Sequence, residues 1–380
     1  MTGAVIGRDE MIAFRWRAHQ LDRARGSGTI ADTALLDAGV QDTGPQGARW
    51  ALANRGLEAY DDADVLLAWT IRVSPHLYRR ADLKHVTVAT APFDEADAAK
   101  RIYDASKALR QAGIPVLEAL AVVAGKQREL VTGPMDKGSL STALTKRLDP
   151  PYLRHCNPCN ATHAWEAPFR MAALQGGLEL EPGTSPPVLR RIKGARPLLF
   201  GSPGSGAEER FDVVRNYLRF YGPGRARDAA AYLDAPVKEV EAHWPPDAVP
   251  IEVAGLPGSK DERFVLADDL AALRDAAAGD GDVRLLGAYD AWLQLRDRET
   301  LVEERARAKD LWRVLGRPGA VARDGEVVGT WRPRSKGDAL TVVWEPWRRA
   351  TAVLRAAVED QAERLSEVRG QNLAGVDETS

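Results

Sequence analysis

The chain has 380 residues, 44% of them hydrophobic and 28% charged, and its formal net charge is −2. This length exceeds one ordinary hydrophobic core, so we expect a globular protein of several domains. The nearly balanced charge excludes a general attraction to nucleic acid or to an anionic membrane. Any surface that binds nucleic acid must therefore come from local clustering of basic residues.

The cysteine content and the lack of long apolar segments indicate a compartment. Cys156 and Cys159 are too few and too close in the sequence for a disulfide framework, which points to a reducing environment. No basic segment leads into an apolar run at the N-terminus, and no apolar run approaches the length that spans a membrane. We therefore expect a cytoplasmic protein without a membrane partner, and we expect it to be a monomer.

The first quarter of the chain contains a polar corner between two predicted helices. Apolar residues repeat at helical spacing over residues 9–21, and residues 32–38 favour a short helix that Gly39 ends. Helical spacing resumes at Arg49, and extended chain follows through residue 79, which is the order of a winged helix. The corner can be a helix cap followed by a turn, or a site whose polar groups face a ligand. Its carboxamide, carboxylate and hydroxyl belong to Gln41, Asp42 and Thr43.

Two later segments repeat this order of helices followed by strands. In the third segment of the chain, counted from the N-terminal one, helices over 211–221, 226–233 and 237–244 precede a strand at 250–253, which is the winged helix-turn-helix order. The alternative for that segment is a small helical bundle packed on an unrelated sheet. The middle segment has a predicted long helix over 94–112, an apolar stretch over 116–124, an amphipathic stretch over 139–148, a helix over 161–174, and short strands at 178–181 and 187–191.

The C-terminal third changes to strand periodicity. Asp324-Gly325 between apolar residues predicts a hairpin, and strands over 330–333 and 340–344 complete a three-stranded meander before a helix over 347–368. We therefore predict an α+β fold of three tandem winged helix-turn-helix units followed by an antiparallel β meander and a long helix. The predicted divisions are 1–92, 93–200 and 201–260 for the three winged helices, 261–369 for the C-terminal region, and 370–380 for a disordered tail.

Three segments together resemble one family. The first is Val40-Gln41-Asp42-Thr43 with Pro45 and Arg55, and the second runs from Trp69 to Leu77 with Asp82 beyond it. The third is Tyr289-Asp290 with Arg296-Asp297-Arg298, followed by Gly325 to Trp331. In this order and spacing they are similar to the winged-helix DNA-binding family of AlkZ/YcaQ-type DNA glycosylases, which unhook alkylation crosslinks.

The resemblance implies a concave DNA-binding scaffold of three winged helices with a Gln-x-Gln or Gln-x-Asp pair at its inner surface. The first residue of that pair falls on Gln41 and the second on Thr43, where the family has Gln or Asp. Asp42 lies one residue too early. The chain therefore matches the family pattern at one position of the pair and departs from it at the other.

Hydrolysis of the glycosidic bond of an alkylated purine needs little from an enzyme, because the cationic base is already a good leaving group. The remaining work is to position a water molecule and to stabilise positive charge on the sugar. Either Thr43 positions the water less effectively than a carboxamide would, or Asp42 takes over through a local change of register, or the chemistry is absent. In a helix Gln41 and Asp42 would point about 100° apart, whereas in a loop they could share a target.

Several basic side chains are candidates for contact with DNA. Arg72 and His76 can donate to phosphate oxygens or to the lesion strand, and they can equally be hydrogen-bonded supports within a wing. Arg49 and Arg79 extend this set. Arg170 lies on the predicted 161–174 helix, which would be the recognition helix of the second unit.

A possible metal site is carried by Cys156, Cys159 and His163, whose Cys-x2-Cys-x3-His spacing can bind zinc. His155 could add a fourth ligand only if the backbone folds back sharply, and the chain has no other cysteine. We favour no metal and no cofactor, and we interpret both thiols as packing at the start of the 161–174 helix.

We therefore expect a DNA-binding protein that acts as a monofunctional DNA glycosylase on bulky or crosslinked alkylpurines in double-stranded DNA. The alternative is a non-catalytic winged-helix DNA-binding protein or transcriptional regulator, which would bind DNA without releasing a base.

Overall fold

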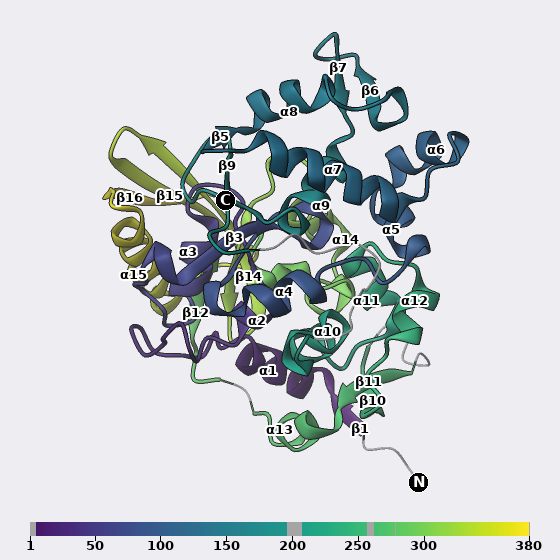
Figure 1. Cartoon of the computed structure of the whole chain (residues 1–380). Coiled ribbons are helices and arrows are strands. Elements are labelled where there is room, and N and C mark those ends of the chain that lie inside the picture. The colour runs from purple at the N-terminus through teal and green to yellow at the C-terminus, as the bar shows by residue number, and fades with distance from the viewer. Residues whose placement is uncertain (1–4, 196–206, 257–261, 278, 380) are drawn as a thin grey trace.

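The computed structural model describes residues 5–195, 207–256, 262–277 and 279–379. Helices and mainly antiparallel sheets alternate along these residues, so the α+β class that the sequence predicts is confirmed (Figure 1). The described strands form four sheets of six, five, three and two strands. One hydrophobic cluster runs through most of the described chain, and a second joins the C-terminal sheet to its helix.

The N-terminal helices are α1 (Arg8–Ala18), α2 (Leu35–Ala38) and α3 (Gly47–Ala53). Gly39 ends α2 with φ +88°, as the sequence predicts. A Cβ atom at this position would lie 2.4 Å from the ring of Tyr78, so the close approach also requires glycine. The chain leaves α2 into a short strand, β2 (Val40–Gln41).

The six-stranded sheet has the order β2-β4-β3-β8-β9-β5. It joins strands from both sides of the division predicted at residue 92, because Leu67 of β3 pairs with Leu180 of β8. Helix α9 packs against β3 on this sheet and against α7. The remaining bounds are β3 (Val65–Trp69), β4 (Pro75–Arg79), β5 (Met135–Asp136), β8 (Leu178–Leu180), β9 (Val188–Arg191), α4 (Leu83–Ala89), α7 (Val116–Leu130), α8 (Lys137–Thr145) and α9 (Glu166–Gln175).

Two helix predictions in the middle segment are wrong in detail. The helix expected over 94–112 is divided into α5 (Glu95–Arg101) and α6 (Tyr103–Gln111), because Ile102 leaves helical geometry at φ −105° and ψ 17°. The helix expected over 161–174 begins instead as a strand. The turn at residues 157–160 folds Ala161–Ala164 (β7) back onto Leu153–Cys156 (β6), and α9 starts only at Glu166.

The third segment follows its predicted order. Helices α10 (Val213–Tyr221), α11 (Ala226–Leu233) and α12 (Val237–Ala242) precede strand β10 (Ala248–Ala254). This strand pairs antiparallel with β11 (Arg263–Leu266) and parallel with the N-terminal strand β1 (Val5–Gly7). The predicted divisions at 200/201 and 260/261 lie outside the described residues.

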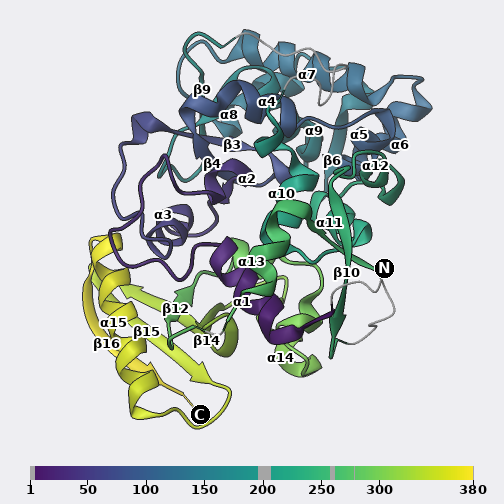
Figure 2. The same cartoon turned by 90° about the horizontal axis from the view of Figure 1, so that it is seen from below.

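The C-terminal region contains the predicted meander within a five-stranded sheet, β12-β13-β14-β15-β16, and α15 lies against it (Figure 2). Residues 370–379 are not a disordered tail, and that prediction is wrong. Gly370 ends α15 with φ +62°, and β16 then pairs in parallel with β15, where Leu373 and Val376 pack on the second cluster. The bounds are β12 (Val283–Leu286), β13 (Gly319–Arg323), β14 (Glu326–Lys336), β15 (Ala339–Pro346), β16 (Asn372–Glu378), α13 (Leu270–Arg274), α14 (Arg305–Leu311) and α15 (Ala352–Arg369).

Among the described helices, none is by itself long and apolar enough to cross a membrane. The pair α6 and α7 has that combined length and composition but is bent by 104° between its two helices.

Candidate active site

The polar corner is extended chain rather than helix. Strand β2 pairs antiparallel with β4, and the backbone N–H of Asp42 continues the ladder by donating to the carbonyl of Pro75 at 2.8 Å. Because side chains alternate along extended chain, Gln41 and Thr43 share one face and Asp42 points to the other. All three side chains are half-buried.

Gln41 and Thr43 contact each other directly. The amide nitrogen Nε2 of Gln41 donates to Oγ1 of Thr43 at 3.0 Å, and Oε1 of Gln41 accepts from the Arg72 guanidinium at 3.2 Å. The same guanidinium nitrogen donates to Oε1 of Gln294, also at 3.2 Å. One arginine therefore holds two carboxamides at fixed positions, and it sets the orientation of Gln41.

Arg72 lies in the loop between β3 and β4, and Tyr232 of α11 holds its side chain in place. Its other terminal nitrogen donates to the carbonyl of Tyr232 at 2.8 Å, and the guanidinium lies 4.7 Å from the centre of the Tyr232 ring. Arg72 and Val73 both have left-handed backbone conformations, with φ of 54° and 49°. Such a conformation is costly, above all for a β-branched residue, and is often kept at functional sites.

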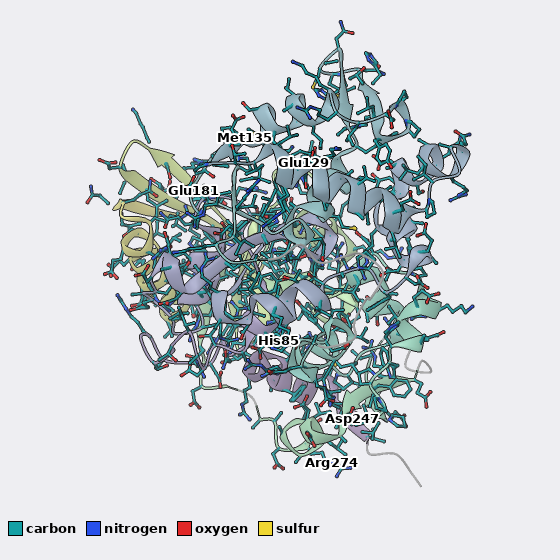
Figure 3. All side chains as sticks on the ribbon, viewed as in Figure 1. His85, Glu129, Met135, Glu181, Asp247 and Arg274 are labelled. Carbon is teal, nitrogen blue, oxygen red and sulfur yellow. The ribbon has the colours of Figure 1, made fainter. Side chains whose placement is uncertain are left out.

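Asp42 faces a different environment. Its Oδ1 accepts the backbone N–H of Ala48 at 2.9 Å, at the start of α3. It lines a pocket of about 770 Å³ together with Arg49 of α3, Tyr60 between α3 and β3, Trp69 of β3, and Glu181 just after β8. Figure 3 labels Glu181, which follows β8, and Met135 of β5, and strand β9 lies between β8 and β5 in the sheet. Burial raises the pKa of the Asp42 carboxyl above its ordinary value.

His76 and Arg79 of β4 are buried and make their contacts inside the protein. Nδ1 of His76 lies 2.9 Å from the carbonyl of Ser74, and burial, reinforced by the positive charge of Arg72, lowers the pKa of His76 to about 3. Arg79 pairs with Asp37 and Asp82. The DNA contacts predicted for His76 and Arg79 stay predictions, and the contacts that the structure gives these two side chains are internal.

Arg49 and Arg170 remain partly accessible. Arg49 lies over the Tyr60 ring, 4.6 Å from its centre, and lines the Asp42 pocket. Arg170 is in α9, where its Nε bonds Glu166 at 2.6 Å and a terminal nitrogen donates to the carbonyl of Val73 at 3.3 Å. It thus supports the strained loop that carries Arg72.

Further arginines cluster with Arg72 and are not among the DNA contacts predicted from the sequence. Burial, reinforced by the charge of Arg72, lowers the pKa of Arg296, and burial with repulsion from Arg296 and Arg317 lowers the pKa of Arg298 to about 10. Within the described part of the chain, Nε of Arg296 and Nε of Arg298 have no hydrogen-bond partner. Mutually repelling, poorly satisfied guanidinium groups are suited to bind an anion such as a phosphate. The Arg-Asp-Arg motif was visible in the sequence, but its proximity to Arg72 was not.

Gln294 was missed for the same reason. It is buried, and its Nε2 has no hydrogen-bond partner among the described residues although its Oε1 accepts from Arg72. It lies between two of the quoted motif positions, Asp290 and Arg296, and carries no local signal of its own. Only the tertiary fold brings it next to Gln41.

Other motif residues form buried ion pairs that join distant segments. The guanidinium of Arg55 bonds both carboxylate oxygens of Asp290, at 3.0 and 2.9 Å, and both side chains are fully buried. Arg15 and Arg263 share Asp297, at 2.9 and 2.7 Å. These pairs fix α3, which follows the corner, and α1 to the segment that carries Gln294 and Arg296.

The predicted metal candidates Cys156, Cys159 and His163 lie together on the β6–β7 hairpin, with their ligand atoms within 4.8 Å of one another. Gln41, by contrast, is in β2 of the six-stranded sheet. The corner and the cysteine hairpin are therefore two separate features.

A carboxamide and a hydroxyl held in place beside several arginines can orient a water molecule next to a polyanion. This combination on an α+β scaffold suits one class of protein, namely a hydrolase that acts on a polyanion such as a nucleic acid.

Comparisons with known proteins agree with this class. The solved structure of the Streptomyces sahachiroi DNA glycosylase AlkZ matches with a TM-score of 0.66 and 19% identity, over 99% of this chain and 100% of that one. A comparison with curated protein sequences finds no match. The family described as DNA glycosylase AlkZ-like matches residues 31–368. The chain therefore belongs to the AlkZ-like DNA glycosylase family, which confirms the predicted family and the predicted DNA glycosylase function.

Proposed function

We propose that this glycosylase hydrolyses the N-glycosidic bond of bulky or crosslinked alkylpurines in double-stranded DNA, and that Gln41 is its central catalytic residue. The observation that carries the proposal is the Gln41 carboxamide, held between the Arg72 guanidinium and the Thr43 hydroxyl. A side chain fixed by two partners on one face of a strand is preorganised, so little reorganisation opposes the reaction.

The hydrogen-bonding capacity of the pair supports a role in orienting water. Oε1 of Gln41 accepts one bond from Arg72 and keeps a second lone pair, and Oγ1 of Thr43 accepts from Gln41 and keeps its own proton and a lone pair. A water molecule between these two oxygens could donate both of its protons. Its oxygen would then form a bond to C1′ of the sugar as the C1′–N bond breaks and the alkylpurine leaves as a neutral base, and the proton that the water loses passes to solvent.

Asp42 offers a second way to supply the same chemistry. Its carboxylate is on the opposite face from Gln41, and it opens into the pocket of about 770 Å³ that Arg49 and Tyr60 also line. A carboxylate there would stabilise positive charge on a sugar bound in that pocket more strongly than a hydroxyl. The two arrangements cannot act on one sugar from the same side, so substitutions at Thr43 and Asp42 distinguish them.

Binding to the DNA backbone is proposed for Arg72, Arg296, Arg298 and Arg317, with Arg49 at the pocket. Clustered guanidinium groups relieve their mutual repulsion when a phosphate enters.

We propose that the surrounding scaffold consists of three winged helices within the divisions 1–92, 93–200 and 201–260, followed by a C-terminal region from 261 to 369. We also propose that the protein acts as a cytoplasmic monomer and that base release needs no cofactor.

The test is release of N7-alkylguanine from duplex DNA under single-turnover conditions, with binding to the same duplex measured separately. We expect Gln41→Ala to lower the release rate by about 100-fold, the scale of losing a preorganised polar contact in a transition state, while binding changes little. Thr43→Val lowers the rate if the hydroxyl is the partner, and Asp42→Asn lowers it if the carboxylate is. If Gln41→Ala and Thr43→Ala both leave release unchanged, the corner is not the site. DNA binding without base release by the parent protein would support the non-catalytic alternative.

A further inference from the structure

The β6–β7 hairpin gathers three side chains that are good ligands for a transition metal. The two thiol sulfurs of Cys156 and Cys159 and a ring nitrogen of His163 all lie within 4.8 Å of one another. In a tetrahedral zinc site, Zn–S and Zn–N bonds place two ligand atoms roughly 3.6–3.8 Å apart. The longest separation must therefore shorten by only about 1 Å, which side-chain rotation at an exposed hairpin tip can supply.

The register of the hairpin determines which residues converge. Arg154 pairs with His163 and Cys156 pairs with Ala161, so Cys156 and His163 are diagonal neighbours on one face. His155 pairs with Thr162 on the opposite face, and both are exposed. His155 is therefore excluded as a ligand, and its only route to the metal, a sharp backbone reversal within β6, does not occur.

The turn that joins β6 to β7 carries Cys159, three residues after Cys156. It spans residues 157–160, and Asn160 adopts the left-handed conformation at φ +46°. The backbone N–H of Cys159 donates to the sulfur of Cys156. Backbone N–H groups that donate to a ligating sulfur orient it and stabilise its negative charge, as partners outside the coordination sphere do in many metal sites.

We propose that Cys156, Cys159 and His163 bind one zinc ion, with a solvent molecule completing a tetrahedral site. Two thiolates and an imidazole select zinc over magnesium or calcium, which prefer oxygen ligands. The described residues supply three ligands and no fourth. An open fourth position also leaves the metal able to accept a donor atom from a bound partner.

The location explains what the metal does for the fold. The hairpin is a two-stranded sheet on its own, projecting beyond α7 and α8 (Figure 1). A two-stranded hairpin is marginally stable in water without further support. A metal that links β6, the turn and β7 closes the hairpin, and the chain continues from β7 into α9, which carries Arg170.

The test uses untagged, full-length protein purified with a reductant, loaded with zinc and dialysed against metal-free buffer. The metal is counted per chain by mass spectrometry, and cobalt replaces zinc so that thiolate-to-cobalt charge transfer reports the ligands. We expect one equivalent of zinc in the parent and in the control His155→Asn. We expect loss of stoichiometric zinc and of the charge-transfer band in Cys156→Ser and His163→Asn.

Hydrogen exchange of residues 153–164 provides a second readout that does not depend on glycosylase activity. Zinc should slow exchange there in the parent and in His155→Asn but not in His163→Asn, while the thermal unfolding midpoint of each variant shows that the rest of the fold is intact. The proposal is overturned if the reduced parent retains less than stoichiometric zinc, if a Cys156–Cys159 disulfide forms instead and the reduced thiols then take up no metal, or if the ligand variants retain zinc as the parent does.

Discussion

Replacing Arg72 by lysine tests whether the guanidinium acts by holding Gln41. The arginine fork donates to Gln41 and Gln294 at 3.2 Å and to the carbonyl of Tyr232 at 2.8 Å. A lysine ammonium keeps the positive charge but cannot reproduce this fork. A hydrogen bond to a charged group contributes about 1.5–3 kcal/mol, and the long 3.2 Å contact favours the lower value. We expect Arg72→Lys to slow base release by about 10-fold, since 1.36 kcal/mol corresponds to a factor of ten.

The assay is single-turnover release of N7-methylguanine from duplex DNA with enzyme in excess, combined with a double-mutant cycle. If Arg72 acts through the carboxamide, Arg72→Lys should add little to the loss caused by Gln41→Asn. Arg80→Lys is the matched control, because Arg80 bonds Glu179 and the carbonyl of Ala63 and does not contact the corner. Fully additive losses, or an unchanged rate in Arg72→Lys, would refute the positioning role.

Three further predictions concern pH, salt and stability. Burial raises the pKa of Asp42 above 3.8, so the folded protein keeps a proton there that the unfolded chain loses, and the stability contribution of this group falls as pH rises through the raised pKa. If the Asp42 carboxylate is the catalytic partner, the rate of base release drops as pH falls through that pKa. Asp42→Asn then abolishes this acid limb of the pH–rate profile. Arg298→Ala should weaken binding to duplexes of any sequence and lower the slope of log K against log salt by about 1, as measured by fluorescence anisotropy across a salt series; an unchanged slope would remove Arg298 from the interface. Asp290→Asn leaves the fully buried Arg55 without its counter-ion, so we expect urea unfolding to show a loss of about 3–5 kcal/mol in the free energy of unfolding. The control Arg23→Ala breaks a more exposed pair with Asp32 and should lower the free energy of unfolding by less than about 1 kcal/mol.

Elements that depend on local signals were predictable from the sequence. The hairpin at Asp324-Gly325 forms as expected, because both residues adopt positive φ, at 49° and 89°. Helices α10 and α11 match their apolar stripes closely. Gly39 ends α2 as predicted.

Elements that depend on a distant partner were not predictable. Residues 372–378 carry too few apolar residues to indicate a strand, and they form one because β15 offers a free edge. Likewise, residues 161–164 read as the start of a helix until the turn before them pairs them with β6. At the site, Gln41 and Arg72 could be named from motifs, but Gln294 and Arg317 come from segments more than 200 residues away and became visible only in the folded chain.

The register of β2 explains why a threonine, and not the neighbouring aspartate, stands beside Gln41. A slip of one residue would bring Asp42 onto the face that Gln41 now occupies, but it would also turn every side chain of the strand to the other side. Val40, which is 1% exposed, would lose its place in the core, at a cost of about 1.5–3 kcal/mol. The backbone hydrogen bonds between β2 and β4, from the Val40–Leu77 pair to the Asp42–Pro75 bond, would also have to break and form again in the new register. Packing therefore fixes the register, so Asp42 can contribute only from its own pocket, and the partner of Gln41 on its own face is the Thr43 hydroxyl.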